Sequence, residues 1–295
     1  PGSKSAGRVQ SVALKLICER ELEIENFNIE EYWSISSLFL KSSDENLPAR
    51  LIVLDSKKLA KMDIHNEDEA NIALVKIKKS QFNITKIEKK RVTRNPLAPF
   101  TTSTLQQEAS NKLGFGASRT MRIAQKLYEG INIGSETTGL ITYMRTDGVQ
   151  LSSEAIEEVR NEITNRHGKS YVPASPRVYK SKAANAQEAH EAVRPTEISR
   201  DPDSIASYLD SEQMKLYQLI WIRTISSQMQ SAELDETSAD ISSDDGSIVF
   251  RANGSQVHFP GFFVYKNKED DKILPNLIEG EKVKLNTVDS DQHFT

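Results

Sequence analysis

Hydrophobic side chains near the start of the chain recur at helical spacing. Val9, Val12, Ala13, Leu16 and Ile17 occupy positions i, i+3, i+4, i+7 and i+8, which is the stripe of an amphipathic helix. The pattern predicts a helix that runs to about Asn26. Residues 1–7, with two glycines and two serines, predict a loop before it.

Between Tyr32 and Ile87 the pattern changes to short β-prone runs separated by polar turns. The runs cover residues 32–40, 50–54 and 84–87, and their content of aromatic and β-branched residues predicts strands. One helical pattern lies near residues 67–78. This part therefore reads as a small β-rich unit, which Pro96 and Pro99 interrupt.

The residues after Pro99 are mostly helical in pattern. Three helices are predicted from their cap residues, which are Ser103 or Thr104, then Ser118, then Ser152 or Ser153. Gly114 and Gly130 are expected to end the first two helices. Leu140 to Met144 reads as a short buried strand, and a longer helix is predicted from about Asp203 to Met229.

The tail from Ser238 returns to β-prone runs, at residues 248–250, 257–259, 262–265 and 282–285. A β-rich part, a helical part and a second β-rich part predict an α+β, multidomain fold in which a helical domain is inserted into one β-rich unit. The expected segments are 1–31, 32–99, 100–229 and 230–295. The linkers near residues 96–99 and 228–234 would then be paired hinges.

Composition agrees with a globular chain. It has 295 residues, 37% of them hydrophobic and 27% charged, which suggests about two domains. Its apolar runs are far shorter than the 18 or so residues that a membrane span needs. The single cysteine, Cys18, excludes a disulfide framework or a cysteine-based zinc site within this chain. A reducing cytoplasm is the simplest setting, and the start without Met or an apolar signal suggests an internal cut through a longer protein.

The formal net charge of −4 hides an asymmetry. Residues 86–126 contain nine basic and two acidic residues, a local charge of +7, whereas residues 226–295 contain six basic and 13 acidic residues, a local charge of −7. A polyanion could therefore bind one face of the molecule. The alternative is that residues 86–94 form the solvated face of a strand.

The segment from Gly139 to Asp147 contains the most informative chemistry. In extended backbone Tyr143, Arg145 and Asp147 would project to one side. A phenol oxygen can attack phosphorus while the guanidinium holds the non-bridging oxygens. A free tyrosine is only about one-thousandth phenolate at pH 7, so such a nucleophile needs a base or nearby positive charge, which Arg145 can supply. Taken alone, the spacing also fits an ordinary packed tyrosine.

Two further segments could bind a phosphate backbone. Ser5, Ala6, Gly7, Arg8, Val9 and Gln10 lie at a predicted helix start, where free N–H groups favour anions. His190 and Arg194 are four residues apart, on one face if the segment forms a helical turn before Pro195. For either segment, a capped and solvated loop is an equally good interpretation.

Four ordered segments between residues 5 and 198 point to a family. They are SAGRVQSVALKLICERE, PFTTSTLQQEASNKLGFGASRTMRIAQKLYEG, GLITYMRTD and HEAVRPTEI. Together they resemble the bacterial type IA DNA topoisomerases, and the tail ILPNLIEGEKV with QHFT is similar as well. By that resemblance Tyr143 is the nucleophile that forms a 5′-phosphotyrosine bond, and Arg145 is its phosphate partner. The resemblance also implies that further residues line the active site and single-strand groove: Ser5, Ala6, Gly7, Arg8, Val9, Gln10, Asp147, His190 and Arg194.

The resemblance further implies a place in a torus of four parts. Residues 1–31 would be a helical strip of the DNA-groove domain, residues 32–99 and 230–295 the β-rich arch, and residues 100–229 the helical gate. The intact protein would relax negatively supercoiled DNA in the bacterial cytoplasm with Mg²⁺ and without ATP. Its partner would be single-stranded or negatively supercoiled DNA, with no small-molecule substrate.

The metal ligands of this family lie in a domain that this chain lacks, so no metal ligand is expected here. Two D-x-D spacings, Asp201–Asp203 and Asp289–Asp291, are expected to be turns or caps. Gly130 to Thr138 is longer than the usual connection before the family's Tyr strand.

Two other classes of protein share part of this pattern. A tyrosine recombinase also uses Tyr with Arg and His, but its nucleophile follows those residues and its spacing is H-x-x-R. Here Tyr143 precedes His190, and the spacing to Arg194 is H-x-x-x-R. A non-catalytic module that binds single strands stays open as the alternative, although aromatics at 7% form no regular stacking array.

Overall fold

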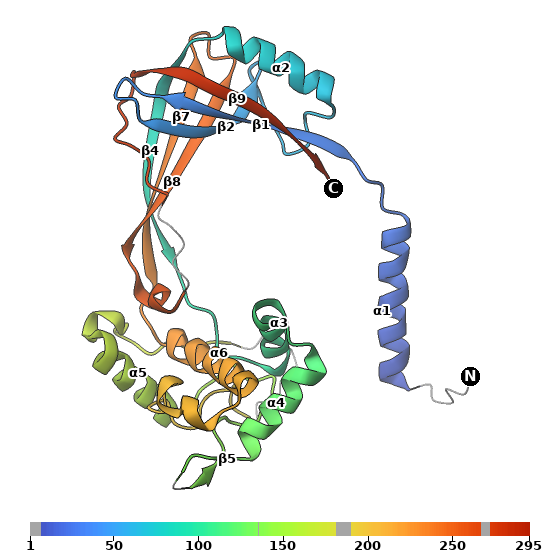
Figure 1. The fold of residues 1–295 in the computed structure, drawn as a ribbon, viewed down its shortest axis with the longest axis vertical. Helices are drawn as coiled ribbons and strands as arrows, with labels where there is room; N and C mark the ends of the chain where they lie inside the picture. The colour runs from blue at the N-terminus through green and yellow to red at the C-terminus, as the bar shows by residue number, and fades with distance from the viewer. Residues whose placement is uncertain (1–6, 135, 181–189, 267–271) are drawn as a thin grey trace. The chain divides into compact units, whose positions relative to one another are not determined.

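The computed structural model describes residues 7–134, 136–180, 190–266 and 272–295. The chain divides into two compact units (Figure 1). The first comprises Pro1–Lys89, Thr237–Gly254 and Lys272–Thr295, and the second comprises Lys90–Glu236 and Ser255–Asp271. The α+β class expected from the sequence is confirmed, with a β-rich first unit and a helical second unit.

Seven strands form the main sheet. They are β1 (Glu31–Leu40), β2 (Asn46–Leu54), β3 (Lys57–Lys58), β4 (Phe82–Arg94), β7 (Ala232–Ser243), β8 (Val249–Phe259) and β9 (Lys282–Phe294). Their order is β1-β9-β4-β7-β8-β2-β3, and β1 also pairs antiparallel with β2, which closes the strands into a ring. Pairing of β1 with β9 and of β2 with β8 joins chain segments that the sequence predicted to share one β-rich unit.

Three phenylalanines form the centre of the first unit. The Phe39 ring lies edge-on to Phe82 and Phe250, with ring centroids 5.1 Å and 5.3 Å away. Helix α2 (Glu67–Lys79) lies along the strands and buries Ala70 and Ile77 against this core (Figure 1). Its acidic first turn and basic last turn suit the helix dipole.

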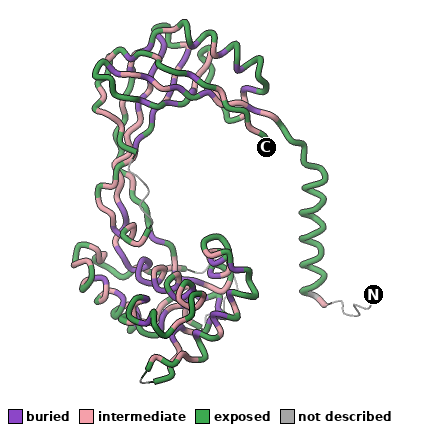
Figure 2. The backbone as a smooth tube through the Cα atoms, viewed as in Figure 1, coloured by how far each residue is buried: buried purple, intermediate pink, exposed green. Residues whose placement is uncertain are grey.

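Helix α1 (Arg8–Glu25) confirms the first predicted helix, which ends one residue before Asn26. Its expected apolar stripe is exposed, with Val9 83% and Ile17 65% accessible. Figure 2 shows this exposure along the helix. The pairs Lys15–Glu19 and Arg20–Glu23 are surface contacts of the usual helical spacing.

The second unit contains four α-helices within the described residues. They are α3 (Thr102–Leu113), α4 (Ala117–Glu129), α5 (Ser153–His167) and α6 (Ser211–Ser227), with a hairpin of β5 (Ile131–Asn132) and β6 (Thr137–Thr138) after α4. Three short 3₁₀ turns complete it: η1 (Lys169–Tyr171), η2 (Asp203–Tyr208) and η3 (Gly261–Tyr265). Helix α6 lies at its core and buries Tyr217 and Trp221, whose polar atoms donate to the carbonyls of Arg200 and Ile198.

Two of the predicted helix caps were wrong by two or three residues. Thr101, not Ser103 or Thr104, caps α3. The Thr101 hydroxyl accepts a hydrogen bond from the Thr104 amide, and the Thr101 amide donates to the Thr104 hydroxyl. Gly116, not Ser118, precedes α4. Ser152 caps α5 as expected.

The single helix predicted over residues 203–229 was also wrong. Asp210 accepts hydrogen bonds from the amides of Glu212 and Gln213 and so begins α6 afresh. The residues before it form the separate 3₁₀ turn η2.

Two of the predicted strands, at residues 140–144 and 262–265, do not form. Leu140 to Met144 makes one isolated bridge, from Ile141 to Pro195. The ladder goes no further because the amides of Leu140 and Arg194 donate to the Leu127 carbonyl and the Thr142 hydroxyl instead. Residues 262–265 lie in η3, which begins at Gly261 directly after Pro260. Gly261 has φ +48°, and the carbonyls of Gln230 and Ser231 leave no room for a Cβ there.

The two ends of the helical unit lie side by side. Ser231 Oγ donates to Asn95 Oδ1 over 2.7 Å, and the Tyr179 hydroxyl contacts the carbonyls of Pro96 and Ser227. The two predicted linkers are therefore adjacent. The boundaries between the units fall at Lys89/Lys90 and Glu236/Thr237, within β4 and β7, rather than at the expected 99/100 and 229/230.

Candidate active site

Tyr143, Arg145 and Asp147 alternate with buried neighbours. The three are exposed, whereas Met144 and Thr146 between them are buried. The exposure of these residues alternates with a period of two, and the backbone bends at Met144. That the three side chains share one side stays a prediction.

Two other segments fix this backbone. The Thr102 hydroxyl, at the start of α3, donates to the Met144 carbonyl over 2.8 Å and accepts from the Thr146 amide over 2.8 Å. On the preceding side, the Thr142 amide donates to the Arg194 carbonyl over 2.8 Å. The buried half of the segment is therefore bonded into the unit, which leaves the exposed half free for a ligand.

The Tyr143 ring has an aromatic neighbour from each of two elements. The Tyr128 ring, at the end of α4, lies 5.4 Å away between centroids with an interplanar angle of 63°. The His190 ring lies 5.6 Å away at 57°. Tyr143 remains 36% exposed, so its phenol is supported by rings and still open to solvent.

Arg145 and Asp147 make no hydrogen bond or ion pair within the described parts of the chain. An unpaired guanidinium two residues from an exposed phenol is free to bind an anion. That Tyr143 and Arg145 act on one phosphate together stays a prediction.

Arg194 is bonded within the protein instead. Its Nε donates to Glu191 Oε2 over 2.5 Å and its Nη1 to the Pro195 carbonyl over 2.9 Å. Burial, the largest single effect, raises the pKa of Glu191, but the hydrogen bond and charge of Arg194 together with hydrogen bonds from Ser152 outweigh it and leave that pKa lowered. The predicted helical turn from His190 to Arg194 was wrong, because Val193 and Pro195 form bridges in extended backbone.

The N-terminal candidates belong to the first unit. Ser5 and Ala6 lie outside the described residues, as does the side chain of Arg8. The Gly7 amide donates to Gln10 Oε1 over 2.8 Å at the start of α1, and Val9 is exposed. The predicted helix start is thus present.

The basic run over residues 86–94 is largely neutralised by its neighbour in the sheet. On β4, Arg91 bonds to Asp235 over 3.0 Å and Arg94 bonds to Glu236 over 3.0 Å, both on β7. The Arg91 guanidinium holds the pKa of Asp235 below its ordinary value. The two oppositely charged segments therefore meet across the sheet through Arg91 and Arg94, and residues 88–91 lie on an exposed stretch of the strand.

The described residues contain no group of three or more His, Cys, Asp or Glu side chains that could hold a metal ion. Asp201 accepts from the Ser204 amide and from Arg166, as a turn residue does. Asp289 and Asp291 lie exposed on β9 rather than in a turn.

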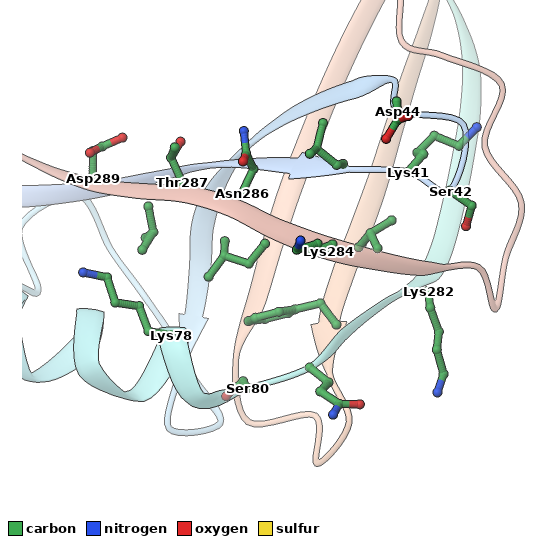
Figure 3. Close-up of a pocket in the computed structure, with 16 residues that line it drawn as sticks. Lys41, Ser42, Asp44, Lys78, Ser80, Lys282, Lys284, Asn286, Thr287 and Asp289 are labelled. Atoms are coloured by element: carbon green, nitrogen blue, oxygen red, sulfur yellow. The ribbon is translucent and has the colours of Figure 1, made fainter.

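A pocket of about 940 Å³ lies in the first unit and includes none of the predicted site residues (Figure 3). Lys41, Lys78, Lys282 and Lys284 are among its lining residues. The buried Lys41 ammonium donates to Glu45 and to the Asn276 carbonyl. Lys41 therefore has a structural role.

No helix in the described ranges is long and apolar enough to span a membrane.

Comparison with known proteins decides the family. A family model described as DNA topoisomerase matches residues 2–295. The chain belongs to this DNA topoisomerase family. It is 52% identical over 302 residues to DNA topoisomerase 1 of Rickettsia bellii, covering all of this chain and 38% of that protein, and 52% identical to its Rickettsia felis counterpart, covering 39% of it.

A solved structure of full-length topoisomerase I from Thermotoga maritima superposes on the whole chain with a TM-score of 0.81 and 34% identity, covering 46% of that protein. This topoisomerase chain therefore spans well under half the length of the relatives that it matches. Tyr128 is the residue at its site that sequence reasoning missed. Nothing in the local spacing of α4 marks it, because only the tertiary fold brings it to Tyr143.

Proposed function

We propose that this chain carries the nucleophile of a type IA DNA topoisomerase. The Tyr143 oxygen attacks a phosphorus of one DNA strand, which forms a 5′-phosphotyrosine bond and breaks the bond from phosphorus to the 3′-oxygen. The phenol loses its proton and the 3′-oxygen gains one. The reverse reaction reseals the strand without ATP, because the phosphotyrosine bond conserves the energy of the phosphodiester.

One observation supports this proposal above the others. An exposed phenol and, two residues later, a guanidinium with no partner among the described residues lie on a segment whose alternate residues are buried and bonded into the unit. The Arg145 fork can hold two non-bridging phosphate oxygens and offset charge that develops in the transition state. A rigid backbone between the two residues keeps them in register with one phosphate.

The proposed partner is DNA, single-stranded or negatively supercoiled, since a tyrosine can reach phosphorus only on an accessible strand. Mg²⁺ is proposed as a requirement of the full-length protein. Because DNA is the substrate and the relatives are bacterial, we expect the protein to act in the cytoplasm beside the nucleoid.

The test is Tyr143→Phe in the full-length protein. The change removes only the attacking oxygen, so we expect covalent protein–DNA adduct to vanish while the Kd for a single-stranded oligonucleotide stays within about twofold. Tyr208→Phe is the matched control, since Tyr208 is another exposed tyrosine of the same unit, and it should cleave normally. Adduct that persists in Tyr143→Phe would contradict the proposal. Absence of adduct in the unaltered protein as well would favour the non-catalytic single-strand binder.

A further inference from the structure

Tyr128 lies edge-on against Tyr143. The ring centroids are 5.4 Å apart and the rings cross at 63°, which is a favourable aromatic geometry. Both side chains are partly open, with Tyr128 40% and Tyr143 36% exposed. The contact between the two rings therefore lies at the surface of the unit, where we propose that a DNA strand binds. The Tyr128 hydroxyl makes no hydrogen bond within the described ranges.

The main chain holds the two tyrosines in this relation. A Cβ on Gly139 would lie 2.5 Å from the Tyr128 carbonyl oxygen, so only glycine permits the segment before Tyr143 to pass so close to the end of α4. The next amide, of Leu140, donates to the Leu127 carbonyl over 2.7 Å. The Gly139 carbonyl is in turn bonded by the Thr196 hydroxyl over 2.7 Å.

We propose that Tyr128 is a positioning residue for Tyr143, an inference that rests on the proposed function. Its ring restricts rotation of the Tyr143 ring on one side, as His190 does from another element. The phenol oxygen is thereby directed toward the phosphate that Arg145 holds. Attack at phosphorus requires the incoming oxygen, the phosphorus and the departing 3′-oxygen to be nearly in line, so orientation of the phenol controls the rate.

The experiment compares Tyr128→Leu, which removes the ring, with Tyr128→Phe, which keeps it. In the full-length protein we expect Tyr128→Leu to lower the single-turnover cleavage rate constant by about tenfold to a hundredfold, because small misplacement of a reacting group has effects of this size. The Kd for the same oligonucleotide should change by less than about twofold. Tyr128→Phe should restore the cleavage rate.

Tyr208→Leu is the matched control for loss of an exposed tyrosine of this unit and should cleave at the normal rate. Thermal unfolding checks that each variant is folded, and Tyr128→Met, which also lacks a ring, replaces Tyr128→Leu if that variant is not.

Three results would overturn the proposal: normal cleavage by Tyr128→Leu, equally slow cleavage by Tyr128→Phe, or a weakened Kd that accounts for the whole defect. The first refutes positioning, the second assigns the effect to the hydroxyl, and the third makes Tyr128 a DNA contact. Adduct formed by Tyr143→Phe would instead refute the proposed function itself, so the two failures are distinguishable.

Discussion

The main-chain carbonyl oxygen of His190 lies against the Cα atom of Gly148, where an added Cβ would approach it to less than 3.0 Å. Gly148 follows the exposed Tyr143–Asp147 segment, just as Gly139 precedes it. Each glycine thus admits the backbone of one ring neighbour of Tyr143: Gly139 admits Tyr128 and Gly148 admits His190. The placement of both rings depends on the absence of a side chain at two positions.

Gly148→Ala should therefore displace His190 from Tyr143. The added methyl meets main-chain atoms, which cannot rotate away, so we expect a loss of about 1–3 kcal/mol in the free energy of unfolding. Cleavage by the full-length protein should fall as well. Urea denaturation and a covalent-adduct assay measure the two effects.

Gly116→Ala provides the comparison, because no atom lies within 4 Å of a Cβ built there. It should lose at most about 1 kcal/mol, as an N-cap position of α4, and should cleave normally. If Gly148→Ala proved as stable and active as Gly116→Ala, the close approach of the His190 carbonyl to Gly148 would matter neither for stability nor for cleavage.

Arg145→Lys should depress cleavage strongly although it keeps the positive charge. An ammonium group is a single point charge, whereas the guanidinium presents a planar fork to two phosphate oxygens. We expect at least about a tenfold fall in the single-turnover rate constant of the full-length protein. A near-normal rate would remove Arg145 from the reacting site.

Arg194 and Arg145 should differ in their effect on stability. Arg194→Ala breaks hydrogen bonds to Glu191 and to the Pro195 carbonyl, so we expect the chain to lose about 1–3 kcal/mol. Arg145→Ala removes an exposed, unpaired side chain and should change stability by less than about 0.5 kcal/mol. Equal losses in urea denaturation would mean that the distinction drawn from these contacts does not hold in solution.

The exposed residues of the site were predictable from local sequence, whereas the ring of Tyr128 that packs against Tyr143 was not. The alternating exposure of Tyr143, Arg145 and Asp147 follows the period of two that the sequence predicts. Tyr128 is 15 positions earlier on a helix, and no spacing rule joins it to Tyr143. Its role follows from how α4 packs against the segment after Gly139.

Sequence reasoning failed elsewhere for similar reasons. The charges of the basic segment that contains β4 and of the acidic segment that contains β7 can be read from the sequence. The pairing of the two strands depends on their order in the sheet, which a count of charges does not give. Residues 262–265 have the composition of a strand, yet they form a 3₁₀ turn because Gly261 adopts a positive φ against two carbonyls. The class and the order of elements were predictable, since hydrophobic periodicity determines them directly.

His167 should make the helical unit sensitive to mild acid. Burial, reinforced by the positive charge of Arg166, lowers the pKa of His167, and its Nε2 lies 2.8 Å from the Tyr265 hydroxyl. The unfolded chain, with an ordinary His pKa of about 6.5, then binds the proton more readily than the folded chain does. Stability should be full above that pH and should decline as the pH falls below it.

The measurement is the free energy of unfolding of the chain between about pH 7 and pH 5, a window above the ordinary titration of carboxylates. His167→Gln should flatten the decline, because glutamine gains no proton. An unchanged slope in that variant would assign the pH dependence to other groups.

The isolated 295-residue chain should bind single-stranded DNA only weakly. Arg194 is bonded within the unit, and Arg91 and Arg94 of β4 are paired with β7, whereas Arg145 makes no such bond within the described ranges. Few phosphate contacts give low affinity, and each adds about −0.7 to the slope of log affinity against log salt for single strands. Fluorescence anisotropy at several salt concentrations would measure both quantities.

The same isolated chain should form no covalent adduct with DNA, even when Mg²⁺ is supplied. A free tyrosine is only about one-thousandth phenolate at neutral pH, so attack requires a base or a strong positive field. Arg145 offers part of that field, but the described residues form no carboxylate group for a metal, and the chain corresponds to 38% of its Rickettsia bellii relative. Labelled single-stranded DNA, incubated with the chain and then denatured, provides the assay. A Tyr143-dependent covalent band would show that the reacting groups are complete within these residues and would refute the prediction.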